Sequence, residues 1–383
     1  MTLKFGEPDD NSGGRPGRLR VVVETESSFD TADGLGVYAS ELLSALQALQ
    51  GPDLEIVPLR SPARRTHKHY LLERLSFDQI QVPWKACQAR ADLLHRTFGS
   101  SPLLMPCPTV LTVHDLIPSV RPQGWPWRAR LYHDFWMRFS MRRATAIIAI
   151  SESTRQDISR LTSVAPERIE VIPEGVSGEF RPVESNGHVE QVLDKHSLRQ
   201  PYILAVGALD HRKNVPMLLE AFSLCRRRGV LSSRHSLAIV GPQNPETLRC
   251  YAQQAERLEA EARVVGRVSR EDLVALYQGA ELFVFPSAYE GFGLPPLEAM
   301  ACGTPVIASA VTSIPEVVGD AAVLVSPPLT AERFADAMAV LASDPQARRE
   351  LSCKGKARAA LFSWSNTARR TLEVYRRVAA AAG

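Results

Sequence analysis

The sequence predicts an α/β protein with two doubly wound parallel-sheet domains that face each other across a cleft. A chain of 383 residues is too long for one ordinary core, so two domains are expected. Short apolar runs alternate with amphipathic segments, which is the pattern of consecutive β–α–β units. The alternation stops at 174–200, where Gly, Pro, Asn and mixed charges follow no period, and restarts at Tyr202.

This break sets the expected domain boundaries. We place an N-terminal domain at 18–180, a linker at 181–200 and a C-terminal domain at 201–364. Residues 1–17 are polar and rich in Gly, Pro and Asp, which is typical of a disordered tail. They lack the apolar core of a signal peptide.

Composition excludes several functional classes. Hydrophobic residues make up 45% of the chain and charged residues 23%, as in soluble globular proteins. A net charge of +3 gives no indication of nucleic-acid binding. The six cysteines are scattered without a C-x-x-C pair, which favours reduced thiols and a cytoplasmic location. No apolar run approaches the length of a membrane span.

Six apolar runs of the first half are expected to form strands. Gly34 and Gly36 follow the first of them and open a helix with leucines along one face. Glycines at such a turn allow close approach by a ligand or by the opposite domain, and an ordinary turn is an equal alternative. The expected strands are 18–24, 55–59, 92–97, 109–117, 145–150 and 168–173.

Two of these strands carry a histidine near their carboxyl end, His95 and His114. Open parallel sheets bind ligands at this edge. A lone histidine is more often packed in the core with its ring bonded to the backbone, and we expect this of His95. For His114, which precedes an aspartate, ligand binding and core packing both remain open at this point.

Two basic segments have alternative interpretations. Residues 60–78 hold Arg, Lys and His without a clear period, typical of a solvated loop or of an acceptor-binding or membrane-facing loop. Residues 124–143 hold three Trp and five Arg, with Leu131, Phe135 and Phe139 at helical spacing. This indicates either an amphipathic helix at an anionic membrane surface or an ordinary core-facing helix with exposed arginines.

In the second half, the strand 202–206 is followed by the adjacent cations Arg212 and Lys213. Two cations at the carboxyl end of a strand could neutralise a diphosphate, with Arg offering a fork and Lys a point charge. The alternative is surface charge at a helix start. A cation is unfavourable at that end of the helix dipole, which favours the functional interpretation.

The most informative stretch is 282–309, LFVFPSAYEGFGLPPLEAMACGTPVIAS, predicted to form strand, loop, helix and strand. A double proline opens the helix, where a missing amide costs little. The amides of Phe292, Gly293 and Leu294 are therefore free at the helix mouth. Free amides and the positive end of the dipole favour an anion, usually phosphate.

Two carboxylates, Glu290 and Glu298, flank this expected anion site. Carboxylates accept hydrogen bonds from sugar hydroxyls. A phosphate site between two such carboxylates suits a nucleotide sugar. The alternative is that Glu298 only complements the helix dipole and that Glu290 is a solvated loop charge.

The E-x7-E spacing of these glutamates, followed by A-x-G-x-P-V from Ala301, resembles the retaining glycosyltransferases of family 4 (GT4), which have the GT-B fold. The resemblance implies that Glu298 binds the nucleotide ribose and that Glu290 contacts the donor sugar. It also implies that the amides of 292–294 hold the diphosphate. The GT-B fold further implies that the last helix, 365–382, packs back on the first domain.

Other segments share the resemblance. The segment G-x-x-x-x-R-K-N implies that Arg212 and Lys213 bind the donor phosphates, and T-x-H-D-x implies that His114 meets the donor sugar through its ring or its carbonyl. The expected catalytic residues are thus His114, Arg212, Lys213 and Glu290. By the same resemblance, the expected donor-binding residues are Gly34, Gly36, Val268, Phe292, Gly293, Leu294 and Glu298.

The implied reaction is retaining transfer of a hexose from a nucleotide sugar to a hydroxyl. The 112–118 strand end resembles bacterial GT4 mannosyltransferases of surface-polysaccharide synthesis, which implies GDP-mannose as donor, with UDP-hexoses next, and a lipid-linked or oligosaccharide acceptor. The chain contains no D-x-D sequence, so we expect neither a metal nor another cofactor. The expected location is cytoplasmic, including the inner membrane face. An epimerase, a phosphorylase and a lectin-like protein remain alternatives.

Overall fold

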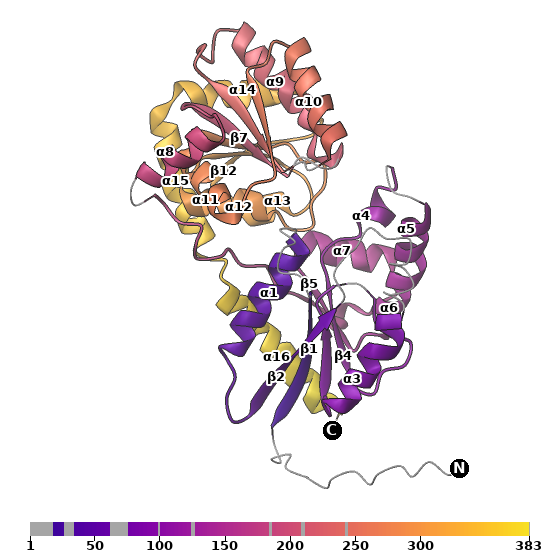
Figure 1. Cartoon of the computed structure of the whole chain (residues 1–383). Helices are drawn as coiled ribbons and strands as arrows, with labels where there is room; N and C mark the ends of the chain where they lie inside the picture. The colour runs from indigo at the N-terminus through magenta and orange to yellow at the C-terminus, as the bar shows by residue number, and fades with distance from the viewer. Residues whose placement is uncertain are drawn as a thin grey trace, which may run out of the picture.

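The computed structural model of the chain describes residues 18–26, 34–61, 76–98, 100–123, 127–183, 186–207, 211–241 and 244–382. The expected tail at 1–17 and most of the basic segment at 60–78 lie outside these residues. The described residues form two α/β domains, which lie one above the other in Figure 1.

The first domain contains a sheet of six parallel strands in the order β2-β1-β3-β4-β5-β6. Every residue of β3, β4 and β5 is buried, because a parallel sheet is covered on both faces. All six strands expected in this half are confirmed. Their bounds are β1 (Leu19–Glu26), β2 (Leu54–Ser61), β3 (Leu93–Arg96), β4 (Thr109–Val113), β5 (Ala146–Ala149) and β6 (Ile169–Val171).

The second domain repeats this plan with six parallel strands in the order β12-β11-β10-β7-β8-β9. Two doubly wound domains are the arrangement expected of the GT-B fold. The strand bounds are β7 (Tyr202–Val206), β8 (Ser236–Val240), β9 (Ala262–Gly266), β10 (Leu282–Phe285), β11 (Val306–Ser309) and β12 (Ala322–Val325).

Helices cover both faces of each sheet, and α5, η2 and α6 follow one another without a break. Among the described residues, no helix combines the length and apolar character needed to cross a bilayer. The first-domain helices are α1 (Gly34–Gln47), η1 (Phe77–Gln81), α3 (Val82–Gln88), α4 (Ile117–Val120), α5 (Trp127–Leu131), η2 (Tyr132–Met137), α6 (Arg138–Arg143), α7 (Glu152–Leu161) and η3 (Pro166–Arg168). Those that follow are α8 (Asn186–Lys195), η4 (His211–Lys213), α9 (Val215–Arg227), α10 (Pro245–Arg257), α11 (Arg270–Gly279), α12 (Leu294–Cys302), α13 (Ile314–Val318), α14 (Ala331–Ser343), α15 (Pro345–Ala359) and α16 (Trp364–Ala382).

The segment 181–200 differs from the irregular linker that we expected, because its centre is the helix α8. Val189, Val192 and Leu193 are buried in the core that this helix shares with the second domain. Their spacing of three and four residues is helical, but the polar residues around them hide the period.

The last helix, α16, returns to the first domain (Figure 1). The hydroxyl of Tyr375 lies 2.5 Å from Nδ1 of His95, and Nε2 of His95 lies 2.8 Å from Oγ1 of Thr112. His95 is therefore a fully buried core residue with both ring nitrogens bonded.

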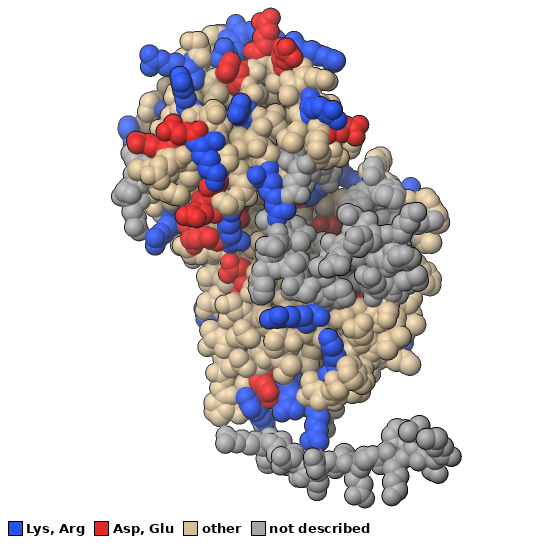
Figure 2. All heavy atoms as spheres, in the orientation of Figure 1, with Lys and Arg blue, Asp and Glu red and all other residues tan. Residues whose placement is uncertain are grey.

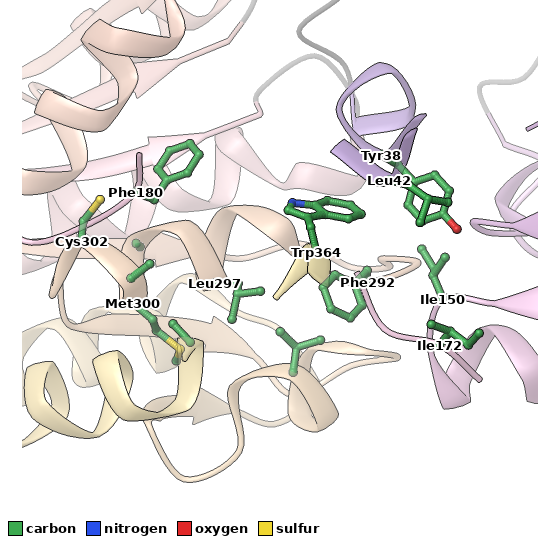
Figure 3. Close-up of a cluster of buried hydrophobic side chains, with 14 of the residues drawn as sticks. Tyr38, Leu42, Ile150, Ile172, Phe180, Phe292, Leu297, Met300, Cys302 and Trp364 are labelled. Atoms are coloured by element: carbon green, nitrogen blue, oxygen red, sulfur yellow. The ribbon is translucent and has the colours of Figure 1, made fainter. Parts of the chain in front are cut away.

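The two domains share one apolar cluster at their junction (Figure 3). Trp364, at the start of α16, belongs to this cluster together with Tyr38 of the first domain and Phe292 of the second. The rings of Trp364 and Tyr38 are 5.7 Å apart at their centroids. Gly175 faces the same crossing, where a Cβ would lie 2.3 Å from the Trp364 amide nitrogen, so only glycine fits without a shift. The domains are thus held in contact beside the cleft edges of both sheets.

Candidate functional site

A carboxylate between two cations forms the centre of the site. Glu290 follows β10, and Arg212 and Lys213 follow β7, its neighbour in the sheet. Arg212 Nη1 lies 2.8 Å from one oxygen of Glu290, and Lys213 Nζ lies 2.6 Å from the other. The hydroxyl of Ser287 donates to the same carboxylate at 2.6 Å. The structure therefore brings three of the four expected catalytic residues into direct contact.

The electrostatics of this cluster keep Glu290 ionised. Burial alone would raise the pKa of its carboxyl, but the charges of Lys213 and Arg212 outweigh burial, so the pKa lies below its ordinary value. Arg212 also donates to the carbonyl oxygen of Tyr289 at 2.9 Å, so the two cations lie against the loop that leads to the helix mouth described next. Lys213 also lies 4.5 Å from the centre of the Phe285 ring, which fixes its ammonium group in place.

The mouth of α12 is the second part of the site. Gly293 has φ of +117°, which a side chain would strain, and the helix begins at the next residue, Leu294. Over the part of the chain that the structure describes, the amides of Phe292, Gly293 and Leu294 donate to no protein acceptor. Such free donors at a helix start fit an anion such as a diphosphate.

Glu298 lies one turn further along α12, half-buried against Tyr277. The hydroxyl of Tyr277 donates to Oε2 of Glu298 at 3.0 Å. Burial raises the pKa of this carboxyl from 4.5 to about 7, and the Tyr277 hydrogen bond opposes the rise only in part. The two glutamates of the motif therefore differ in protonation near neutral pH.

His114 lies on the opposite edge of the cleft, at the end of β4, and its ring is already bonded within the first domain. Nε2 lies 2.9 Å from the carbonyl oxygen of Thr97, and Nδ1 lies 3.2 Å from Oε1 of Glu174. A hydrogen bond from this ring to a sugar hydroxyl, as expected from the sequence, would require one of these bonds to break. The carbonyl oxygen of His114 lies at the contact between the domains.

Gly291 brings the two cleft edges together at this point. A Cβ on Gly291 would lie 2.2 Å from the His114 carbonyl oxygen, so glycine is required for this approach. Ser151 donates to the Gly291 carbonyl at 2.6 Å, and Thr154 donates to the His114 carbonyl at 3.2 Å. Ser151 is also the N-cap of α7, where its hydroxyl accepts from the Thr154 amide. Nothing near Ser151 in the sequence indicates its partner in the other domain.

A second link between the domains involves Glu316, at the start of α13. Its carboxylate accepts hydrogen bonds from the amides of Glu152 at 2.9 Å and Ser153 at 3.1 Å, at the N-terminus of α7. A carboxylate is favourable there because the helix dipole is positive. This contact was not predicted from the sequence. Glu174 was not predicted either, although it closely follows a strand and so lies at the same edge of the sheet that drew attention to His114.

The remaining expected residues are Gly34, Gly36 and Val268. Gly34 and Gly36 form the first turn of α1, and Gly34 is exposed with open space around it. Val268 follows the Gly266 turn after β9 and packs partly buried against the shared apolar core. Among the described residues, no three His, Cys, Asp or Glu side chains gather as a metal site.

Comparison with known proteins adds independent information. Residues 32–180 match the family described as Glycosyltransferase Family 4, and residues 191–358 match Glycosyl transferases group 1. The O-antigen chain mannosyltransferase B of Escherichia coli is 36% identical over 70% of this chain and 70% of its own length. The serotype-specific mannosyltransferase WbdA of the same species is 34% identical over 72% of this chain, which spans only 34% of that relative.

Two further similarities cover nearly the whole chain. The alpha-maltose-1-phosphate synthase of Mycolicibacterium smegmatis is 32% identical over 94% of this chain and all of its own length, 100%. The solved structure of sucrose-phosphate synthase from Thermosynechococcus elongatus superposes with a TM-score of 0.73 at 23% identity, over 95% of this chain and 100% of that one. The chain is therefore a glycosyltransferase with the GT-B fold and belongs to glycosyltransferase family 4.

Proposed function

We propose that this protein transfers mannose from GDP-mannose, with retention at the anomeric carbon, to a hydroxyl of a lipid-linked or saccharide acceptor in surface-polysaccharide synthesis. The observation that carries the proposal is the pair of cations Arg212 and Lys213, which Glu290 holds side by side near the mouth of α12. The amides at this mouth donate to no protein acceptor in the part of the chain that the structure describes. This is the charge arrangement that a departing nucleoside diphosphate needs.

In the proposed reaction, the bond between the sugar C1 and the phosphate oxygen breaks while Arg212, Lys213 and the α12 amides stabilise the charge on the leaving diphosphate. The acceptor oxygen bonds to C1 from the same face, and its proton passes to a phosphate oxygen of the leaving group. Glu290 and Glu298 orient the sugar and the ribose by accepting hydroxyl hydrogen bonds. Retention is tested by NMR of the first product formed, in which the signal of the new anomeric proton reports the configuration at the anomeric carbon.

Mannose is proposed as the transferred sugar because the relatives WbdA and mannosyltransferase B are mannosyltransferases. The donor base is tested by calorimetric titration of the protein with GDP, UDP and dTDP. We expect GDP to bind most tightly. UDP binding tenfold tighter than GDP, a gap of about 1.4 kcal/mol, would overturn the proposed donor and leave the glycosyltransferase assignment intact.

A second candidate acceptor is a soluble sugar phosphate. The full-length similarity to alpha-maltose-1-phosphate synthase favours it. Incubation of the protein with GDP-mannose and, separately, a glucose phosphate or a lipid-linked saccharide distinguishes the two acceptors by mass spectrometry of the products. If transfer occurs to the sugar phosphate alone, the proposals of a lipid-linked acceptor and of a location at the inner membrane face are wrong.

A further inference from the structure

The first domain exposes an unusual number of large apolar side chains. Of the ten such side chains exposed in the described part of the chain, seven lie between residues 80 and 135. We call these seven the apolar surface. They are Ile80, Trp84, Leu103, Leu104, Trp127, Leu131 and Phe135.

The segments that carry the apolar surface are neighbours in space. The amide of Leu103 donates to Oε1 of Gln79 in η1 at 2.9 Å, and the amide of Ser101 donates to Oγ of Ser140 in α6 at 3.1 Å. The loop with Leu103 and Leu104 therefore connects η1 to α6. Figure 1 shows α3, α5 and α6 along the same side of the first domain.

The helix formed by α5, η2 and α6 has apolar residues on two faces. Met137 and Met141 are buried in the core, as in an ordinary surface helix. Trp127, Leu131 and Phe135 recur every fourth residue and are exposed. This corrects the core-facing interpretation of Leu131 and Phe135. Contiguous exposed apolar side chains of this kind mark an interaction site.

The charge around the apolar surface indicates the partner. The helix from 127 to 143 contains five arginines and one acidic residue, Asp134. Arg130, Arg142 and Arg143 are exposed. Asp134 is itself bonded to Ser119 at 2.6 Å and to Arg138 at 3.4 Å. Aromatic and aliphatic side chains beside arginines match the interface of an anionic bilayer, with apolar groups in the acyl boundary and cations at the phosphates.

We propose that the apolar surface docks the first domain on an anionic lipid bilayer. The contact between Ser119 and Asp134 joins this helix to α4, which directly follows the strand end at His114. The docked face thus adjoins the first-domain edge of the cleft, where a lipid-linked acceptor would enter. The choice of acceptor rests on the proposed function, whereas the docking itself does not.

The test is sedimentation of the full chain with vesicles of phosphatidylcholine alone or mixed with phosphatidylglycerol. We expect binding only to the mixed vesicles and weaker binding as salt rises, because exposed charge attraction is screened. The double variant Leu131→Ser with Phe135→Ser should reduce binding at least tenfold. Leu361→Ser is the matched control, since Leu361 is 64% exposed on the other domain and Leu131 is 60% exposed.

The same preparations are assayed for transfer from nucleotide sugar to a soluble saccharide and to a lipid-linked saccharide. Vesicle binding without transfer would leave the docking surface standing and count against the proposed function. Transfer without vesicle binding, or equal binding by the double variant and Leu361→Ser, would overturn the docking surface. A wild-type dimer that the double variant breaks, in the absence of vesicle binding, would also overturn it and assign the surface to a second copy.

Discussion

Each sheet has an arginine that contacts a carboxylate at the edge facing the cleft. The surroundings of these two arginines, Arg96 and Arg212, differ. In the first domain, Arg96 at the end of β3 contacts Glu24 at 3.1 Å and Asp78 at 2.7 Å. All three side chains are buried, and Ser100 donates to Asp78 at 3.2 Å. Arg96 is fully buried, so its charge is not accessible to a ligand.

In the second domain two cations, Arg212 and Lys213, contact the same carboxylate of Glu290. Both cations are also partly exposed, at 22% and 12% of their side-chain surface. Figure 2 shows the same contrast at a larger scale, with charged side chains gathered over the second domain and few acidic ones on the visible face of the first. We therefore expect the buried pair to stabilise the fold of the first domain and the partly exposed cations of the second domain to meet a ligand.

The largest effect on stability is expected from a substitution in the first-domain cluster of Arg96, Glu24 and Asp78. Arg96→Met removes the buried cation that contacts Glu24 and Asp78 and should lower the free energy of unfolding by about 3–5 kcal/mol. Arg20→Met is the control, because Arg20 pairs with Glu55 at 2.9 Å in a part-exposed setting, and should cost below about 1 kcal/mol. Urea denaturation measures both. If Arg96→Met does not fold, Arg96→Lys replaces it, and a loss no larger than that of Arg20→Met would refute the structural role.

Substitutions in the second-domain cluster of Arg212, Lys213 and Glu290 should lower activity and leave stability nearly unchanged. Arg212→Ala or Lys213→Ala should each lower turnover by about 10²–10³-fold, because charge stabilisation of the leaving diphosphate is lost. The melting temperature should change little. Arg228→Ala, which removes a surface pair with Asp336 at 2.7 Å, is the control and should keep full turnover. Turnover of both cation variants within about threefold of wild type would contradict the assignment.

Sequence reasoning succeeded where a site is built from one contiguous stretch. The strand, loop and helix from 282 to 309 fix the spacing of Glu290, Glu298 and the α12 amides locally, so these groups could be named in advance. The partners of His114 could not, because Glu174 lies 60 residues away and is brought close only by the sheet. The buried charge of Arg96 was missed for the same reason.

A smaller effect concerns the pH dependence of donor binding. Glu298 has a pKa of about 7 in the folded protein, above its ordinary 4.5. Only the ionised carboxylate is a pure acceptor for ribose hydroxyls, so affinity for a nucleotide sugar should rise between about pH 5 and pH 7 and then level off. In this window Glu298 binds more protons in the folded state than in the unfolded chain, so the contribution of Glu298 to stability should fall as pH rises.

Calorimetry in buffers of different ionisation enthalpy measures the proton released on binding. Nucleotide sugars suit this test because their phosphates do not titrate near neutral pH. Glu298→Gln should bind without proton release and with a flat pH profile. Release of the same number of protons by Glu298→Gln and by wild type would assign the titration to another group.

The smallest expected effect is that of metal removal. If Arg212, Lys213 and the α12 amides together neutralise the diphosphate, no divalent cation is needed there. Turnover should therefore survive dialysis against a chelator, and added magnesium or manganese should change it by less than about twofold. Elemental analysis of the dialysed protein is the control for complete removal. Strict dependence on either ion would show that the second-domain cluster lacks sufficient charge for the reaction, and the contrast with the Arg96 cluster would then concern burial alone.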